Sequence, residues 1–262
     1  MTARSTGGRL LGALAYLLVV VALWYAYVRL FSVPQFLLPD PVAVGRELVK
    51  TGASGELWPH LAYTVRNVVV GFLLGAGLGV LLGALVTRSW IIDAAMAPFL
   101  VLFQAAPKIA IAPLFVLWFG LGLTSQLALI VSLAFFPVLT GMVMGVRQIE
   151  PQYRDLGRIL GLGAARQFAK IELPATLPSL FAAARISVID SMTGAVLAEF
   201  ISSERGLGYL LVYSNSTYRT PLLIVAIIVI VATGLLMYQL ILLAERRLLG
   251  WHESQITPST GG

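Results

Sequence analysis

The sequence predicts an all-α, polytopic membrane protein with six transmembrane helices. Of its 262 residues, 58% are hydrophobic and only 11% are charged, whereas a soluble domain carries about 25% charged residues. The apolar residues also gather in runs that are long enough for a spanning helix, which needs about 20 mostly apolar residues. We expect spans at 10–31, 65–87, 95–119, 125–146, 178–203 and 221–244.

The first of these runs needs to be distinguished from a secretory signal. Arg4 and Arg9 precede the apolar stretch Leu10–Val28, and signal peptides share that order of charge and apolarity. The stretch is too long for a signal peptide, however, and no A-x-A cleavage site follows it. We therefore expect a cytoplasmic N-terminus at 1–9, a single six-helix domain at 10–250 and a polar tail at 251–262.

The basic residues predict the orientation, because Lys and Arg are enriched in cytoplasmic loops. With the N-terminus inside, four basic residues fall in outer segments and four more lie in or beside spans. The inner segments then hold Arg4, Arg9, Arg88, Arg147, Arg154, Arg158, Arg166, Lys170, Arg246 and Arg247. This bias predicts that both termini are cytoplasmic. In the first outer segment, the turn Pro39-Asp40-Pro41 and the apolar spacing after it predict a short surface helix.

A polar loop at residues 150–174 separates the fourth span from the fifth. Glu150 and Pro151 are typical of a helix start, and Gly161 is typical of a helix stop. A second amphipathic piece, Ala164–Leu173, follows, and Pro174 restricts the backbone before the next span. We expect two short cytoplasmic helices around a glycine, which would offer a shaped surface to a soluble partner.

The spacing within this polar loop resembles the coupling loop of binding-protein-dependent ABC transporter permeases. Their pattern is Glu-Ala-Ala, three residues, Gly, nine residues, Ile-x-Leu-Pro. Here Gly161 is followed after nine residues by Ile171-Glu172-Leu173-Pro174. Asp155-Leu156-Gly157 stands in place of Glu-Ala-Ala, and the glycine should weaken the helix by about 1 kcal/mol relative to alanine. The resemblance implies ATPase-coupling roles for Arg154, Asp155, Gly157, Arg158, Gly161, Ile171, Leu173 and Pro174.

The resemblance covers most of the chain. Within the family, the chain is similar to the nitrate/sulfonate/taurine branch. Its further motifs include Pro107-Lys108-Ile109-Ala110, Phe135-Phe136-Pro137 and Gly206-Leu207-Gly208-Tyr209. It implies the type I ABC importer permease fold in the bacterial inner membrane. The implied partners are a second permease copy, which would form a homodimer, two ATPase subunits and a periplasmic substrate-binding protein. The implied cargo is a small polar or anionic solute, such as nitrate, a sulfonate, taurine or a small heterocycle.

Charged residues within the apolar runs predict a translocation pathway, because such charges are costly in lipid and usually face a cavity or a partner. Lys108 and Asp190 fall near the middle of their spans and could pair, either at a gate or as a structural ion pair. Glu199 lies closer to the outer end. The nine residues from Asp190 to Glu199 place these two side chains half a turn apart, with Thr193 on the Asp190 side. We assign Lys108, Asp190, Thr193 and Glu199 to the pathway.

Other classes fit the sequence less well. A secondary transporter or channel not powered by ATP remains the alternative, but it predicts internal repeats, and the polar loop occurs once. The chain lacks G-x-x-x-x-G-K-[ST], cysteine and any Ser/His/Asp constellation, so we expect no enzyme, no cofactor and no metal site. The net charge of +6 follows from topology, so nucleic acid is not expected as a partner.

Overall fold

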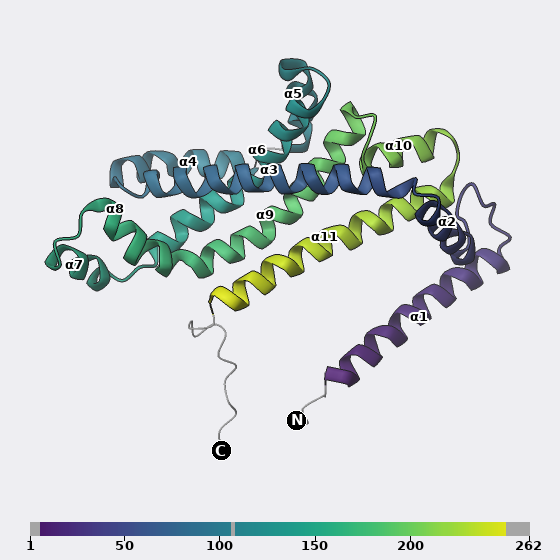
Figure 1. Ribbon diagram of the computed structural model, residues 1–262, viewed down its shortest axis with the longest axis horizontal. Helices are drawn as coiled ribbons and strands as arrows, with labels where there is room; N and C mark the ends of the chain where they lie inside the picture. The colour runs from purple at the N-terminus through teal and green to yellow at the C-terminus, as the bar shows by residue number, and fades with distance from the viewer. Residues whose placement is uncertain (1–5, 106–107, 250–262) are drawn as a thin grey trace.

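A computed structural model of the protein describes residues 6–105 and 108–249 (Figure 1). Every regular element in these ranges is a helix. The elements are α1 (Thr6–Leu30), α2 (Pro41–Ala53), α3 (Leu57–Val86), α4 (Trp90–Ala105), η1 (Lys108–Ile111), α5 (Ala112–Phe119), α6 (Leu123–Arg147), α7 (Pro151–Ile159), α8 (Ala164–Gln167), η2 (Phe168–Glu172), α9 (Leu173–Ser202), α10 (Leu207–Ser216) and α11 (Thr220–Leu248).

Five helical segments are long and apolar enough to cross a membrane, counted over the described residues. They are formed by α1, α3, α6, α8 to α9, and α11, and they match five of the six expected spans. The remaining expected span, 95–119, is not one continuous helix. It is divided into α4, η1 and α5, and Pro113 lies in the first turn of α5. Because proline lacks the backbone N–H that continues a helix, a broken third span is physically reasonable. That these pieces together make the sixth crossing stays a prediction.

The core of the bundle is formed by α3, α6 and α9, which lie side by side in Figure 1. Four glycines at every fourth position of α3 face α6 so closely that a β-carbon on any of them would overlap α6 atoms. They are Gly71, Gly75, Gly79 and Gly83. On α6, a β-carbon on Gly141 would likewise overlap Ala183 of α9, and one on Gly145 would make a tight contact with Thr176. Small residues at this spacing let helices pack closely in lipid.

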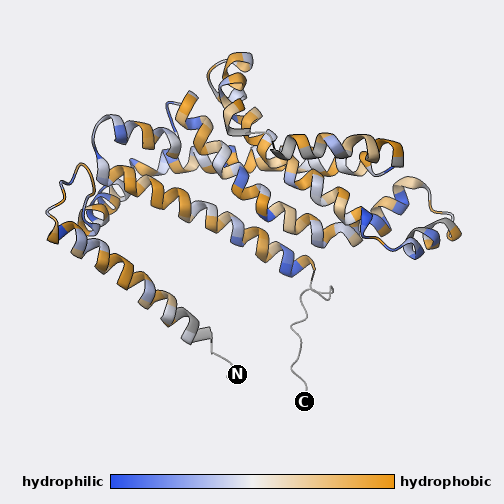
Figure 2. Cartoon of the chain, turned by 180° about the vertical axis from the view of Figure 1, so that it is seen from behind, coloured by the Kyte–Doolittle hydropathy of each residue, from blue (hydrophilic) through white to orange (hydrophobic). Residues whose placement is uncertain are grey.

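The outer surface of the long helices is apolar. Figure 2 shows hydrophobic colour along them and hydrophilic colour gathered toward the helix ends. Many leucines of α1 and α3 are more than half exposed. A soluble protein rarely exposes so much apolar surface, so this surface suits the hydrocarbon region of a membrane. The α1 helix stands apart from the others and meets the rest of the molecule through α2.

The two ends of the bundle differ in what they carry. One end of the bundle, called here the loop end, holds α7 and α8 of the polar loop. The opposite end, called the far end, holds α2 and α10. The expected short helix after the first span is confirmed as α2, with the Asp40 carboxylate accepting a hydrogen bond from the Ala43 amide at 2.6 Å. At the far end, an Arg219 guanidinium nitrogen lies 2.7 Å from a Glu47 carboxylate oxygen, which ties the start of α11 to α2.

Candidate functional site

The polar loop is built as two helical pieces around Gly161, as its sequence predicted. The first piece, α7, ends at Ile159, and the turn after it contains Gly161, whose φ of 63° lies in the left-handed region. The Leu162 amide donates to the Gly157 carbonyl at 3.0 Å, the wrapped contact that commonly ends a helix at a glycine. A residue with a β-carbon would be strained at Gly161, so this glycine sets the turn between the two pieces.

The second piece is not a separate short helix. Helical backbone runs from Ala164 through η2 into α9 without interruption. The η2 segment is a turn of π-helix that ends at Glu172, two residues before Pro174. A proline ring in an α-helix clashes with the carbonyl four residues earlier, here that of Lys170, and a wider π turn relieves such crowding. The loop is therefore a direct extension of a spanning helix.

Gly157 has a packing role that its helix propensity did not indicate. It is buried, and a β-carbon there would lie 3.1 Å from the Ile171 side chain and 3.3 Å from that of Gln167. Glycine at this position lets α7 pack closely on η2. Leu173 packs into a core cluster with Val138 and Met142. Asp155 is exposed, and the side chains of Arg154 and Arg158 lie outside the described residues.

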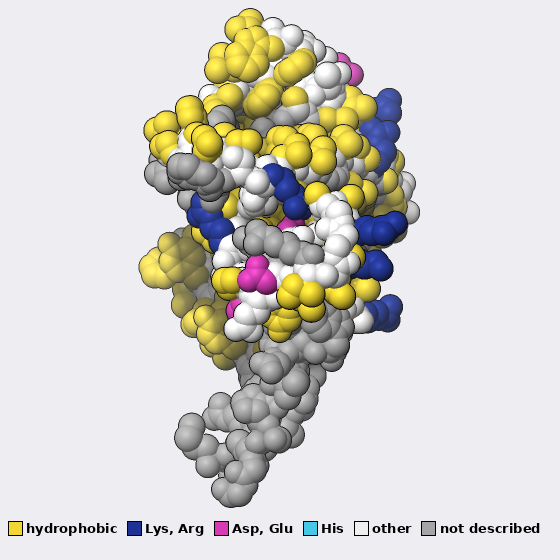
Figure 3. Space-filling view, turned by 90° about the vertical axis from the view of Figure 1, so that its left-hand side faces the viewer, with side chains coloured by type: hydrophobic (Ala, Val, Ile, Leu, Met, Phe, Trp, Pro, Cys, Tyr) yellow, Lys and Arg dark blue, Asp and Glu magenta, His cyan; other side chains and the backbone are white. Residues whose placement is uncertain are grey.

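The outer face of α7 and the turn after it carry large apolar side chains. Tyr153, Leu156, Ile159 and Leu160 are 56%, 48%, 83% and 63% exposed. Figure 3 shows this end of the molecule, where Lys and Arg side chains lie beside hydrophobic ones. Exposed basic residues of this end are Arg147, Arg166, Lys170, Arg246 and Arg247. An apolar patch with a polar rim is typical of a protein-docking surface.

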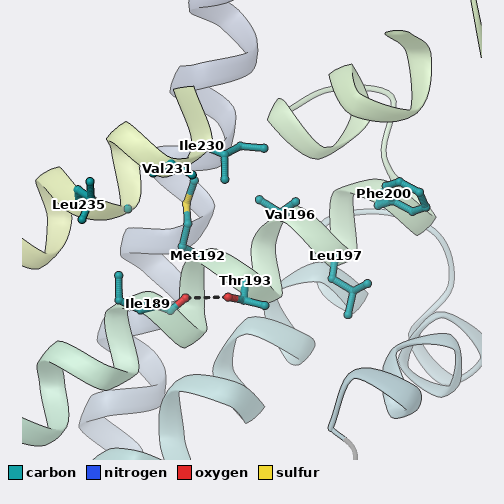
Figure 4. A pocket seen from close by; sticks show the side chains of 10 residues that line it. Ile189, Met192, Thr193, Val196, Leu197, Phe200, Ile230, Val231 and Leu235 are labelled. Carbon is teal, nitrogen blue, oxygen red and sulfur yellow. Dashed lines mark hydrogen bonds between the residues drawn. The ribbon is translucent and has the colours of Figure 1, made fainter. Parts of the chain in front are cut away.

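Two of the predicted pathway residues, Asp190 and Thr193, line different grooves along α9, although helical phase had placed Thr193 on the Asp190 side. Asp190 lines a groove of about 410 Å³ between α6 and α9, together with the polar side chains of Thr140, Gln148 and Ser179. Thr193 lines an apolar groove of about 570 Å³ between α9 and α11 (Figure 4). Its hydroxyl donates back to the Ile189 carbonyl at 3.1 Å.

Lys108 begins η1, but its side chain lies outside the described residues. The pairing of Lys108 with Asp190 therefore stays a prediction.

Glu199 faces away from the Asp190 groove, in agreement with the half-turn phase read from the sequence. It is 1% exposed. One of its carboxylate oxygens accepts hydrogen bonds from the Thr64 hydroxyl at 2.8 Å and from the Gly208 amide at 2.9 Å. The Thr64 hydroxyl in turn accepts from the Leu207 amide at 2.8 Å. Glu199 thus holds the segment between α9 and α10 against α3, inside the protomer.

Sequence reasoning missed the partners of this buried carboxylate. A β-carbon on Gly206 would overlap the Glu199 carboxyl group, and one on Gly208 would overlap the Val196 carbonyl. The two glycines therefore let the backbone close over the acid. The Gly206-x-Gly208 spacing was the available signal, but nothing in it indicated Thr64, which lies 135 residues from Glu199.

This arrangement defines a class: a helical membrane subunit that presents an apolar helix outside its spanning core, where a soluble protein can reach it. Residues 75–250 match the family described as the inner membrane component of binding-protein-dependent transport systems. The chain belongs to this family.

Two relatives support the assignment over nearly the whole chain. A putative aliphatic sulfonates transport permease protein of Bacillus subtilis is 34% identical over 236 residues, covering 90% of this chain and 86% of the relative. A riboflavin transport system permease protein of Chloroflexus aurantiacus is 34% identical over 244 residues, covering 93% and 91%.

Among solved structures, a crystal structure of an amino acid ABC transporter with histidines has a TM-score of 0.58 at 20% identity. It covers 76% of this chain and 97% of that one, which supports the fold. The protein is a multi-pass ABC transporter permease subunit of the inner membrane and not an enzyme. Subunits of this family work with ATPase and substrate-binding partners.

Proposed function

We propose that this permease imports a small polar or anionic solute and that its polar loop, residues 150–174, is where the ATPase acts. Two copies of the chain would form the pore, with two ATPase subunits on the cytoplasmic side and a binding protein outside. Both termini would then be cytoplasmic, in agreement with the excess of Lys and Arg at the loop end.

The observation that carries the proposal is the exposed apolar face of α7. Ile159 is 83% exposed although it is a large apolar residue on a helix outside the spanning core. Leaving such side chains in water is unfavourable, and burying one against a partner contributes about 1.5–3 kcal/mol. We propose that an apolar cleft on the ATPase, with acidic groups at its rim, receives this face.

The continuity of the loop with α9 suggests how force would reach the pathway. Since helical backbone runs from Ala164 into the spanning part of α9, a partner that moves α8 also moves α9. The groove that holds Asp190 lies between α9 and α6. A shift of α9 against α6 would therefore change the width of this groove, which we propose as part of the solute pathway with Lys108 and Thr193.

The solute class rests on relatives and on the polar groups of that groove. Relatives carry names that refer to aliphatic sulfonates, riboflavin and taurine, all of them small and polar. Thr140, Gln148 and Ser179 offer neutral hydrogen-bonding groups beside Asp190. Such a lining suits a solute with both donors and acceptors.

The test replaces Ile159 with aspartate and measures how much ATPase subunit co-purifies with the full-length permease. We expect at least about a tenfold loss of bound ATPase, since 1.4 kcal/mol corresponds to tenfold in affinity and a buried, unpaired carboxylate costs more than that. Because Ile159 is exposed, the thermal stability of the permease should not change.

Leu121→Asp is the matched control, because Leu121 is 77% exposed between α5 and α6, away from the polar loop. It should keep wild-type ATPase binding. If Ile159→Asp binds the ATPase as tightly as wild type, the docking proposal is wrong. Transport that continues without any ATPase would favour a secondary transporter or channel instead.

A further inference from the structure

The end of α3 reaches the polar loop through one arginine. Arg88 lies two residues after the end of α3, next to the C-cap residue Thr87, and its amide donates to the Leu85 carbonyl at 3.1 Å. Its backbone is therefore held at the end of a helix of 30 residues. A cation is favourable at this position, because the carboxyl end of a helix carries partial negative charge.

The Arg88 guanidinium contacts both ends of the π turn, η2. Its two terminal nitrogens lie 2.8 and 3.4 Å from the two carboxylate oxygens of Glu172, the last residue of the turn. Such two-point pairing fixes both distance and angle. The same guanidinium lies 5.4 Å from the centre of the Phe168 ring, the first residue of the turn, within the range of a cation–π contact.

The Glu172 carboxylate depends on this contact. Its side chain is only 7% exposed, and its one further described partner is the Gln167 amide nitrogen at 3.4 Å. A buried carboxylate without a cation is strongly unfavourable. Loss of Arg88 would therefore favour any movement of the turn that returns Glu172 to water.

The π turn is an irregular section of the helix that joins the loop to α9. Pro174 supplies no amide hydrogen to the carbonyl of Lys170, and i-to-i+5 turns are rare and are found mostly as local irregularities. A push on α8 could bend this turn instead of moving α9. Arg88 opposes such bending, because it holds both ends of the turn to α3, which packs along α6 through the glycines described above.

We propose that Arg88 is a positioning residue that locks the π turn, so that movement of the polar loop reaches α9 and α3 together. The inference rests on the proposed coupling role of the loop and adds a residue and a contact to it. The predicted consequence is a stiff connection between α8 and α9, and the absence of Arg88 should make this connection bend.

The stiffness can be measured with two spin labels on either side of the turn. Ala165 and Ala175 are both exposed, and the chain has no cysteine of its own, so cysteines for labelling can be introduced at these two positions. The labelled positions are separated by about 15 Å along the helix, given its rise. The distance distribution is recorded by electron paramagnetic resonance on the full permease–ATPase complex, without nucleotide and with ATP plus vanadate.

In the wild type, we expect one narrow distribution that is the same in both nucleotide states. In Arg88→Ala, we expect it to broaden roughly twofold, since a segment without its side-chain contacts opens more easily, and to shift when ATP is trapped. Glu172→Gln removes the negative partner of the Arg88–Glu172 pair and should also broaden the distribution. Arg88→Lys keeps the charge but loses the two-point pairing, so it should lie between wild type and Arg88→Ala.

Arg246→Ala is the matched control, because Arg246 is an exposed arginine in the last turn of a spanning helix at the same end. It should leave the distribution unchanged. The proposal is overturned if Arg88→Ala gives the wild-type distribution, or if the wild-type distance itself changes between nucleotide states. Co-purification of the ATPase is recorded on the same samples. Loss of ATPase binding only in Ile159→Asp tests the proposed docking face. A broader distance distribution in Arg88→Ala, with the ATPase still bound, tests the role of Arg88 separately.

Discussion

Replacement of Gly79 by alanine tests the closeness of α3 and α6. A β-carbon at this position would lie 2.8 Å from the Phe135 carbonyl oxygen, 2.9 Å from the Val138 β-carbon and 3.0 Å from the Leu139 amide nitrogen. Two of these atoms belong to the α6 backbone and cannot rotate away. Since carbon contacts are optimal at about 3.5–4.0 Å, the two helices would have to separate by about half an ångström or more.

The expected loss of stability in Gly79→Ala has two sources, the overlap itself and the looser packing of the surrounding side chains. Overpacking a tight interface costs about 1–3 kcal/mol, and a separation of about 0.5–1 Å removes a quarter to a half of the dispersion energy between neighbouring atoms. Gly77 is the internal comparison, because a β-carbon there meets nothing within 4 Å. Gly77→Ala should gain up to about 1 kcal/mol from helix propensity.

The assay is thermal unfolding of each purified variant in detergent. For a domain of this size, each kcal/mol corresponds to a shift of about 2–4 °C in Tm. We expect Gly79→Ala to unfold below wild type and Gly77→Ala to unfold at or above it. Equal losses in the two variants, or a Gly79→Ala variant as stable as wild type, would refute the packing argument.

Two further substitutions test buried polar contacts by the same assay. Thr64→Val removes the hydroxyl that donates to Glu199 and accepts from the Leu207 amide, and should lower the free energy of unfolding by about 1–3 kcal/mol. Thr64→Ser keeps a hydroxyl and should lose less. A Thr64→Val variant as stable as wild type would contradict the role given to Glu199. Glu245→Ala leaves Arg185 without the carboxylate 3.1 Å away and should cost about 3 kcal/mol, the lower end for a broken buried pair, because 26% of the Arg185 side chain stays exposed. An unchanged Tm for Glu245→Ala would mean that this pair does not stabilise α9 against α11.

The sequence predicted the spanning helices because an apolar run of sufficient length is itself the physical requirement for crossing lipid. The sequence also has four glycines at every fourth position of α3, a spacing that favours close helix packing. It did not indicate which helix they meet, nor that Gly77 faces away from the four that pack on α6. The expected third span contains Pro113, which favours a break there, but the contact of α5 with α6 is visible only in the structure.

The turn of the polar loop was predicted because its information is local, whereas the continuity of the second piece with α9 was not predicted. The spacing from Gly161 to Pro174 lies within one short segment, and the structure confirms a turn at that glycine. The Arg88–Glu172 pair could not be predicted from the sequence, since the two residues are 84 positions apart and no local pattern marks either of them. Gly157 was read as a weakness of the helix, whereas its buried contact with Ile171 is visible only when α7 and η2 are placed together.

Glu199 shows the limit of reasoning from burial cost alone. A carboxylate in an apolar run is expensive in lipid, and the sequence argument therefore assigned it to the pathway. The same cost can be offset inside the protomer, here by Thr64 and by the backbone at Gly208. Helical phase correctly separated Glu199 from Asp190, but it did not indicate that Thr193 lines a different groove from Asp190.

The proposed coupling to an ATPase requires the polar loop to lie on the cytoplasmic side of the membrane. Single cysteines at Ala165 and Glu204, both exposed, can be treated with a membrane-impermeant maleimide in intact cells and in inverted vesicles. We expect Ala165→Cys to react only in inverted vesicles, more slowly when the ATPase subunit is present, and Glu204→Cys to react only in intact cells. Labelling of Ala165→Cys from outside intact cells would contradict the account.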